Sequence, residues 1–115
     1  MIPKFRAWDK IRNRISEVER IYIDTKGVRL RDENGEYWRR FDDVILMQST
    51  GLVDKNGKEI FEGDIVRMHS GELLPVKLHH GMFEPVCYYA SRAFGRVGNV
   101  FENPELLEHP DFREG

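Results

Sequence analysis

The chain of 115 residues has little of what marks several large protein classes. Its one cysteine, Cys87, cannot form an intrachain disulfide, which excludes a disulfide-stapled secreted fold. Its apolar runs are far shorter than the roughly 20 residues that a membrane-spanning helix needs, and it lacks a secretory signal pattern. These features predict a soluble, cytoplasmic protein with no membrane partner.

A large excess of one sign of charge is also absent. The formal net charge is -2, from 18 Lys and Arg against 20 Asp and Glu, which is not the strongly basic balance typical of phosphate binders. Residues 1–46 contain 11 basic and 9 acidic side chains, and residues 47–115 contain 7 and 11. The difference between the halves is small, but it leaves room for a local basic face.

Catalytic and metal-binding motifs are absent as well. His69, His79, His80 and Cys87 do not have the spacing of common zinc sites. No Ser or Cys nucleophile lies in a sharp-turn motif, and no glycine loop has the order that binds phosphate. We therefore expect a protein without metal or cofactor that is not an enzyme.

Turn signals, by contrast, are frequent. Val28 to Arg31 alternates apolar and basic residues, Asn34-Gly35 follows, and an aromatic segment returns over residues 37–41. Asn-Gly is the strongest short hairpin signal, because glycine adopts positive φ freely and asparagine does so at low cost. This segment predicts an antiparallel hairpin.

Residues 10–20 are ambiguous. Ser16 and Glu19 fit a capping box, which favours a helix of one or two turns. The break at residues 24–27 leaves little room for it, so we prefer a loop that leads into a strand with Ile21 and Ile23 facing inward.

The central segment, residues 46–66, is interpreted as a turn, an apolar anchor, a second turn and a strand. Asn56 and Gly57 predict the first turn. Gly63 supplies a backbone conformation that a Cβ would penalise, and Asp64 accepts a backbone hydrogen bond that fixes the start of the next strand. We prefer this structural role over a carboxylate pair of Glu62 and Asp64, because no further ligand lies at a suitable spacing.

The second half predicts short strands with glycine-rich turns, which suit a small barrel. Asn103 and Pro104 then predict a helix over residues 104–109, with asparagine as the cap and proline at the first helical position. A helix this short is unstable alone, so Leu106 and Leu107 must dock on this domain or on another copy. With Tyr88 and Tyr89 they are the candidate protein contacts.

A basic cluster on the first hairpin is the candidate nucleic-acid contact. Its cations would hold phosphates, and an aromatic ring among them would stack on a base. A solvated strand face that protects a sheet edge is the preferred interpretation, because acidic residues lie close by. The cluster consists of Arg29, Arg31, Arg39, Arg40 and Trp38.

Three segments together resemble the YopX family of small proteins encoded by phages and prophages. They are KFRAWD at residues 4–9, LMQSTGLVDKNGKEIFEGDIV at residues 46–66 and GNVFENPELL at residues 98–107. The resemblance brings no established activity and no catalytic residues. It implies a mostly β protein whose later part is similar to an SH3-type barrel.

The expected fold is mainly β, in a single domain over residues 1–115. Residues 1–48 would form a hairpin-rich β subdomain, and residues 49–115 a small SH3-like barrel with the short helix. The expected function is that of a phage- or prophage-derived interaction module that binds a phage or host protein, or a second copy of itself as a homo-oligomer. The alternative is a nucleic-acid-binding accessory protein.

Overall fold

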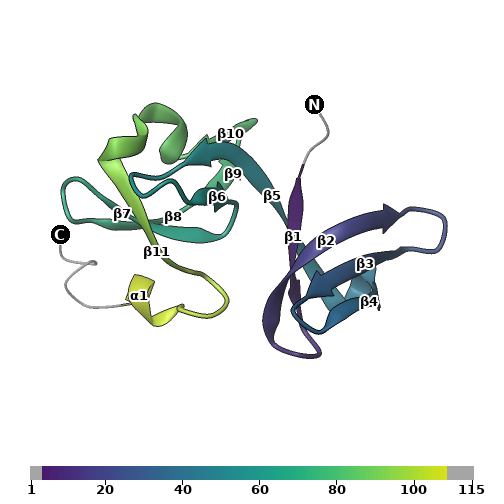
Figure 1. Ribbon diagram of the computed structural model, residues 1–115. Helices are drawn as coiled ribbons and strands as arrows, with labels where there is room; N and C mark the ends of the chain where they lie inside the picture. The colour runs from purple at the N-terminus through teal and green to yellow at the C-terminus, as the bar shows by residue number, and fades with distance from the viewer. Residues whose placement is uncertain (1–3, 109–115) are drawn as a thin grey trace. The chain divides into compact units, whose positions relative to one another are not determined.

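The computed structural model describes residues 4–108, and the chain divides into two compact units after Gln48. Both units are built from antiparallel strands, and the described residues contain a single short α-helix, so the mainly β prediction is confirmed (Figure 1).

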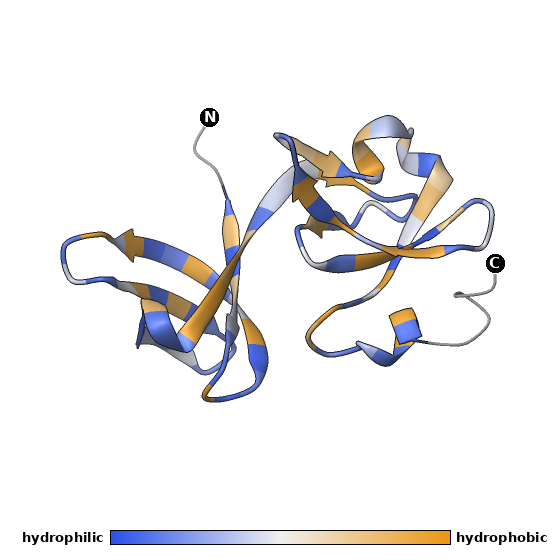
Figure 2. Cartoon of the chain, turned by 180° about the vertical axis from the view of Figure 1, so that it is seen from behind, coloured by the Kyte–Doolittle hydropathy of each residue, from blue (hydrophilic) through white to orange (hydrophobic). Residues whose placement is uncertain are grey.

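The first unit contains four complete strands and the first half of a fifth. The strands are β1 (Phe5–Asp9), β2 (Arg14–Tyr22), β3 (Gly27–Asp32), β4 (Gly35–Arg40) and β5 (Val44–Val53). Their order in the sheet is β4-β3-β2-β1-β5, and all neighbours are antiparallel. Hydrophilic and hydrophobic residues alternate along β3 in particular, so one face is apolar (Figure 2).

The apolar face forms the core of this unit. Ala7, Val28, Leu30 and Val44 are buried, and partly buried side chains such as Tyr37 pack against them. Each fully buried aliphatic side chain contributes about 1.5–3 kcal/mol relative to exposure. The face therefore pins the register, since a slip by one residue would turn these side chains to water.

Residues 10–20 do not form a loop or a helix over most of their length, because β2 begins at Arg14. Two backbone N–H groups, of Ile11 and Arg12, donate to the Asp9 carboxylate and close a tight turn before it. Pairing with β1 on one side and β3 on the other outweighs the local capping-box preference. Of the two isoleucines predicted to face inward, Ile21 packs against the core, whereas Ile23 lies in the next turn and is 73% exposed.

The second unit consists of shorter elements. Its strands are the end of β5, then β6 (Glu59–Phe61), β7 (Asp64–Met68), β8 (Leu73–Pro75), β9 (Lys77–His79), β10 (Met82–Glu84) and β11 (Phe94–Asn99). The second half of β5 pairs with β6, β7 pairs with β8 and β11, and β9 pairs with β10. Among the described residues these sheets remain open and none closes into a barrel.

The core of the second unit lies between these sheets and two 3₁₀ turns, η2 (Val86–Tyr88) and η3 (Ser91–Ala93). Its buried members are Ile60, Val66, Met68, Val76, Val86 and Phe94. Apolar side chains from five separate segments thus meet in one cluster, which explains how such short strands are held.

The C-terminal helix α1 comprises Glu105–Glu108, and residue 109 of the predicted helix lies outside the described residues. Leu106 and Leu107 are half-buried, and the helix lies against β8 of its own unit. The side-chain oxygen of Asn103 accepts from the backbone N–H of Asn99 and not from the helix, so the predicted side-chain cap is wrong.

Candidate binding surfaces

One face of the β2-β3-β4 sheet carries most of the predicted nucleic-acid contacts. Residues directly opposite each other in antiparallel strands point to the same side. The register pairs Arg29 with Trp38 and Gly27 with Arg40, and on the other flank of β3 it pairs Arg20 with Arg29. We call the surface formed by Arg20, Tyr22, Gly27, Arg29, Arg31, Glu36, Trp38 and Arg40 the outer face.

Two aromatic rings meet on the outer face. Tyr22 and Trp38 lie on the strands that flank Gly27, and their ring centroids are 5.4 Å apart with an interplanar angle of 50°. A Cβ added to Gly27 would collide with the six-membered ring of Trp38, so the absence of a side chain lets the ring lie on the backbone of β3. The pair is therefore positioned by packing.

The arginines of the outer face differ in their ion-pair partners. Arg31 forms ion pairs with Glu19 at 2.8 Å and with Glu36 at 3.3 Å. Arg29 pairs with the same Glu36 at 3.4 Å, and its pKa is raised above its ordinary value, mainly by a hydrogen bond with Tyr22 and further by Glu36. Arg20 and Arg40 are exposed and form no ion pair with any described residue. Positive charge thus gathers at the aromatic end.

Arg39 does not belong to the outer face, contrary to the prediction. It lies opposite Val28, on the core side, and its Nε is 3.2 Å from the fully buried Asp9 carboxylate. Its guanidinium also stacks over the ring of Tyr37, which Arg12 covers as well. The physical reason is the period of two along a strand, which puts consecutive residues on opposite faces.

Asp9 is the centre of this inner cluster. Burial opposes its ionisation, but hydrogen bonds from the backbone of Arg12 and Ile11 and from the side chain of Arg39 outweigh burial and lower its pKa. The Tyr37 hydroxyl and the Ser16 hydroxyl share a further hydrogen bond of 2.7 Å. The cluster joins β1, β2 and β4, and its side chains are occupied with one another.

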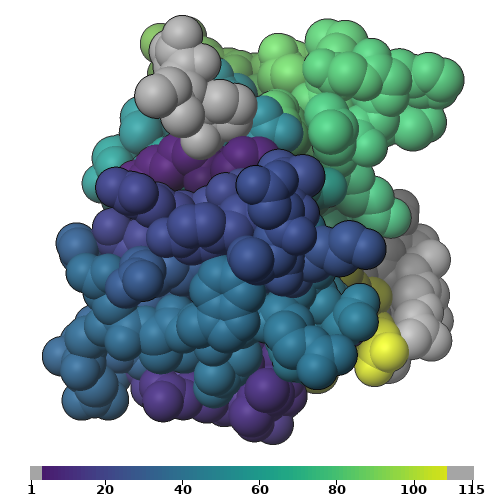
Figure 3. Space-filling model, turned by 90° about the vertical axis from the view of Figure 1, so that its right-hand side faces the viewer, coloured from purple at the N-terminus to yellow at the C-terminus, as the bar shows by residue number. Residues whose placement is uncertain are grey.

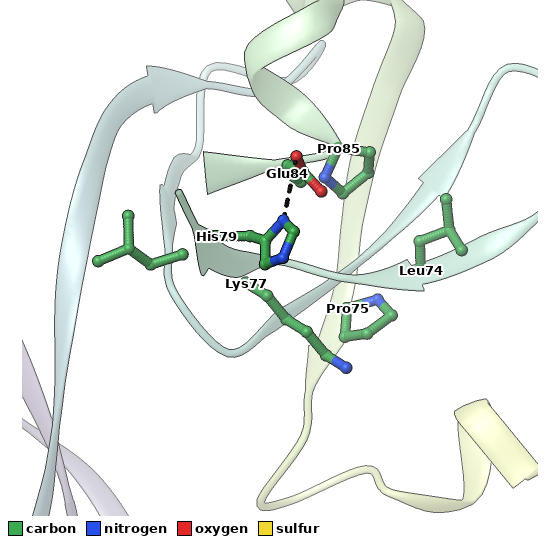
Figure 4. Close-up of a pocket in the computed structure, with 7 residues that line it drawn as sticks. Leu74, Pro75, Lys77, His79, Glu84 and Pro85 are labelled. Carbon is green, nitrogen blue, oxygen red and sulfur yellow. Dashed lines mark ion pairs between the residues drawn. The ribbon is translucent and has the colours of Figure 1, made fainter. Parts of the chain in front are cut away.

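The second unit has a pocket of about 420 Å³ beside the β9-β10 hairpin. Leu74, Pro75, Leu78 and Pro85 line it with apolar atoms. Figure 4 shows His79 and Glu84 pointing toward one another at its side, at 3.6 Å between Nδ1 and Oε2, with Pro85 next to them. The site is mostly apolar and polar at one edge, as small binding sites usually are.

Exposed apolar side chains lie on the β9-β10 hairpin and on the 3₁₀ turn that follows it. Tyr88 and Tyr89, in and after η2, are 60% and 53% exposed, and Leu78 and Met82 of the hairpin are 45% and 42% exposed. Neither tyrosine belongs to the core cluster, to which this part of the chain contributes Val86. We call Leu78, Met82, Tyr88 and Tyr89 the hairpin patch.

The turn residues predicted for the central segment, Asn56, Gly57 and Gly63, do lie in turns. Gly57 and Gly63 have φ of +79° and +88°, while Asn56 has no positive φ. The Asp54 carboxylate accepts the backbone N–H groups of Asn56, Lys58 and Arg96 at 2.8–2.9 Å.

Asp64 accepts the backbone N–H of Phe61 at 2.8 Å and the side-chain N–H of Arg96 at 3.0 Å. Arg96 of β11 therefore contacts both carboxylates, one through its backbone and one through its guanidinium. We call Asp54, Asp64 and Arg96 the clasp.

The other polar side chains that the structure describes form no metal-binding group. In residues 4–108, no three His, Cys, Asp or Glu side chains are grouped in a way that could hold a metal ion. His79 and His80 do touch, with ring centroids 4.0 Å apart, because His80 lies in a turn with φ of +52° and not on the strand. Within the same residues, no helix is long and apolar enough to cross a membrane.

Sequence reasoning missed several surface residues. Arg20 and Tyr22 complete the outer face, and Leu78 and Met82 complete the hairpin patch. The signal for Tyr22 was its alternation with Arg20 on a strand, which becomes visible only once residues 14–22 are assigned to β2.

A known protein family and a solved structure match nearly the whole chain. The model of a family described as YopX protein matches residues 4–108. The crystal structure of protein EF1440 from Enterococcus faecalis is similar with a TM-score of 0.66 and 28% sequence identity, covering 93% of this chain and 99% of that one. No curated protein matches the sequence.

Proposed function

Because this chain belongs to the YopX family, we propose that it is a phage- or prophage-derived accessory protein that works by binding another protein and catalyses no reaction. The hairpin patch beside the pocket carries this proposal. Leu78 is exposed and lines the apolar pocket, and the exposed Tyr88 donates to Glu84, another lining residue, so large exposed side chains lie at the pocket itself.

The chemistry of the patch fits an extended protein segment with apolar anchors. The pocket can take one such side chain, and Tyr88 and Tyr89 offer ring surface with a polar end, as is common at protein interfaces. Glu84 at the edge, which also accepts a hydrogen bond from Tyr88, would favour a basic residue next to the anchor. A second copy of the chain in a homo-oligomer is the alternative occupant.

The absence of catalysis is supported by how the buried carboxylates are used. Asp9, Asp54 and Asp64 are all fully or nearly fully buried, and each accepts hydrogen bonds from backbone N–H groups. Asp9 and Asp64 also pair with arginine. Groups committed in this way are poorly suited to exchange protons with a substrate.

The proposal places the protein in the cytoplasm.

The SH3-like description of the second unit is also part of the proposal. It is supported by the return of β11 to pair with β7 after two 3₁₀ turns, which brings the last strand of the unit beside an early one. A crystal structure with backbone hydrogen bonds that close the remaining edges would establish the barrel.

Capture experiments test the proposed function. Tagged protein is incubated with nuclease-treated lysates of infected and uninfected cells, and the wild type is compared with Leu78→Asp combined with Tyr89→Asp. A partner that binds the wild type and is lost with this variant is expected. Ile23→Asp is the matched control, since it changes an equally exposed apolar residue of the first unit. Equal capture by all three proteins would refute the role of the patch.

A second candidate function, nucleic-acid binding, is favoured by one observation. Trp38 and Tyr22 lie exposed or half-exposed among Arg20, Arg29 and Arg40 on one sheet face.

A further inference from the structure

We infer that the outer face binds single-stranded nucleic acid, with Tyr22 and Trp38 stacking on bases and Arg20, Arg29 and Arg40 holding phosphates. The inference rests on the second candidate function and names its ligand and its contact residues. It differs from the sequence-based cluster, because it adds Arg20 and Tyr22 and leaves out Arg31 and Arg39.

The aromatic pair is fixed before any ligand arrives. Trp38 is 42% exposed, yet its ring is supported from below by the backbone of Gly27 and from the side by Tyr22. A ring held in place loses little conformational entropy when a base stacks on it. Stacking tolerates any base, because every base has a π-face.

The cations are placed at the same end of the face. Arg29 lies directly opposite Trp38 and Arg40 directly opposite Gly27, so both flank the rings. Arg20 and Arg40 have no carboxylate partner among residues 4–108, whereas Arg29 shares Glu36 with Arg31, and Arg31 also pairs with Glu19. An anion is therefore drawn most strongly to Arg20 and Arg40, at the aromatic end of the outer face. Residues of β2 to β4 form a continuous surface in space-filling view (Figure 3).

The geometry favours a single strand over a duplex. Bases in a duplex are covered by their neighbours, whereas an open strand can turn its bases onto a ring. Three strands at a spacing of about 4.8 Å span about 10 Å, which accommodates roughly two or three nucleotides. With three cations, the affinity is expected to fall with salt at a log–log slope of about -2.

Fluorescence anisotropy with a labelled oligothymidylate of about a dozen nucleotides tests the inference, with a duplex of the same length as comparison. Full-length protein should bind the single strand more tightly than the duplex. Trp38→Ala should weaken binding roughly 5- to 150-fold, the range for loss of one stacked base. Arg40→Gln should reduce the salt slope by about 0.7.

Arg92→Gln is the matched control, because it removes the same charge from an exposed position in the second unit. Binding that is unchanged by Trp38→Ala in folded protein, or that is equally tight for the duplex, overturns the inference. If Trp38→Ala fails to fold, Arg40→Gln and Arg20→Gln decide, since both side chains are exposed. Capture of a protein partner should be unaffected by these variants, so the two functions fail separately.

Discussion

Replacing Asp54 should loosen the second unit at two places that are far apart in sequence. Asp54 is 2% exposed and accepts three backbone N–H groups, two from its own turn and one from Arg96 of β11. Hydrogen bonds to a charged acceptor contribute about 1.5–3 kcal/mol each, and part of this is recovered when water reaches the amides. We therefore expect Asp54→Ala to reduce the free energy of unfolding by about 3–5 kcal/mol.

Asp54→Asn provides the matched comparison. Asn56 and Lys58 donate to one carboxylate oxygen and Arg96 donates to the other. An amide can keep its oxygen toward the turn, but its NH₂ group then faces the N–H of Arg96, where it cannot accept. The variant should therefore keep the turn, lose the bond to β11 and cost about half as much as Asp54→Ala.

Amide hydrogen exchange measured by NMR separates these outcomes. Exchange at Asn56, Lys58 and Arg96 should accelerate in Asp54→Ala, and mainly at Arg96 in Asp54→Asn. Urea denaturation followed by far-UV circular dichroism gives the free energies, with the exposed Glu72→Ala as the control. A loss below about 1 kcal/mol, or equal exchange in both variants, would refute the reasoning.

The Asp54 carboxylate should also make the stability of the second unit depend on pH under acidic conditions. Burial opposes ionisation of Asp54, but the bonds from Arg96, Lys58 and Asn56 outweigh burial and lower its pKa below the ordinary 3.8. Its contribution to stability is thus complete above the unfolded pKa and is lost as pH falls through the folded pKa.

The remaining predictions concern the first unit, where both tryptophans lie and fluorescence reports unfolding. Arg39→Ala leaves the buried Asp9 carboxylate without its cation and should cost about 2–4 kcal/mol, whereas Arg40→Ala should cost less than about 0.5 kcal/mol; equal losses in urea denaturation would contradict the placement of Arg39 on the inner side. Gly27→Ala should destabilise the unit by about 1–3 kcal/mol because the new Cβ displaces Trp38, and the cost should largely vanish when Trp38→Ala is also present. Additive losses in this double-mutant cycle would show that the ring does not lie on the glycine.

The two Asn-Gly turns show which part of the fold could be predicted from the sequence. Both occur as Asp-x-Asn-Gly, and in each the aspartate accepts the backbone N–H of the asparagine. The turns are local, so Asn34-Gly35 and Asn56-Gly57 were sufficient to place them. Their mechanism was missed, because the preceding Asp32 and Asp54 stabilise the turns, and only the glycines have positive φ.

Non-local pairing explains most of what was missed. Arg14 to Tyr22 carries a helix-start pattern that is overruled by strands on both sides, and these partners are not visible within the segment itself. The contact of Arg96 with Asp54 spans 42 residues and has no local signal. The error about the position of Arg39 has a different cause. Consecutive residues of a strand point to opposite faces, so Arg39 and Arg40 cannot both lie on the outer face, and the sequence alone was sufficient to show this.

The clasp also has a consequence for synthesis on the ribosome. Asp54 and Asp64 leave the exit tunnel well before Arg96, and at about 5–20 residues per second the delay after Asp54 is roughly two to eight seconds. During that interval both carboxylates remain hydrated and the nascent second unit stays incomplete. A ribosome that stops short of residue 96 would release a product whose first unit has all its strands and whose second unit lacks its closing cation, an early target for proteases.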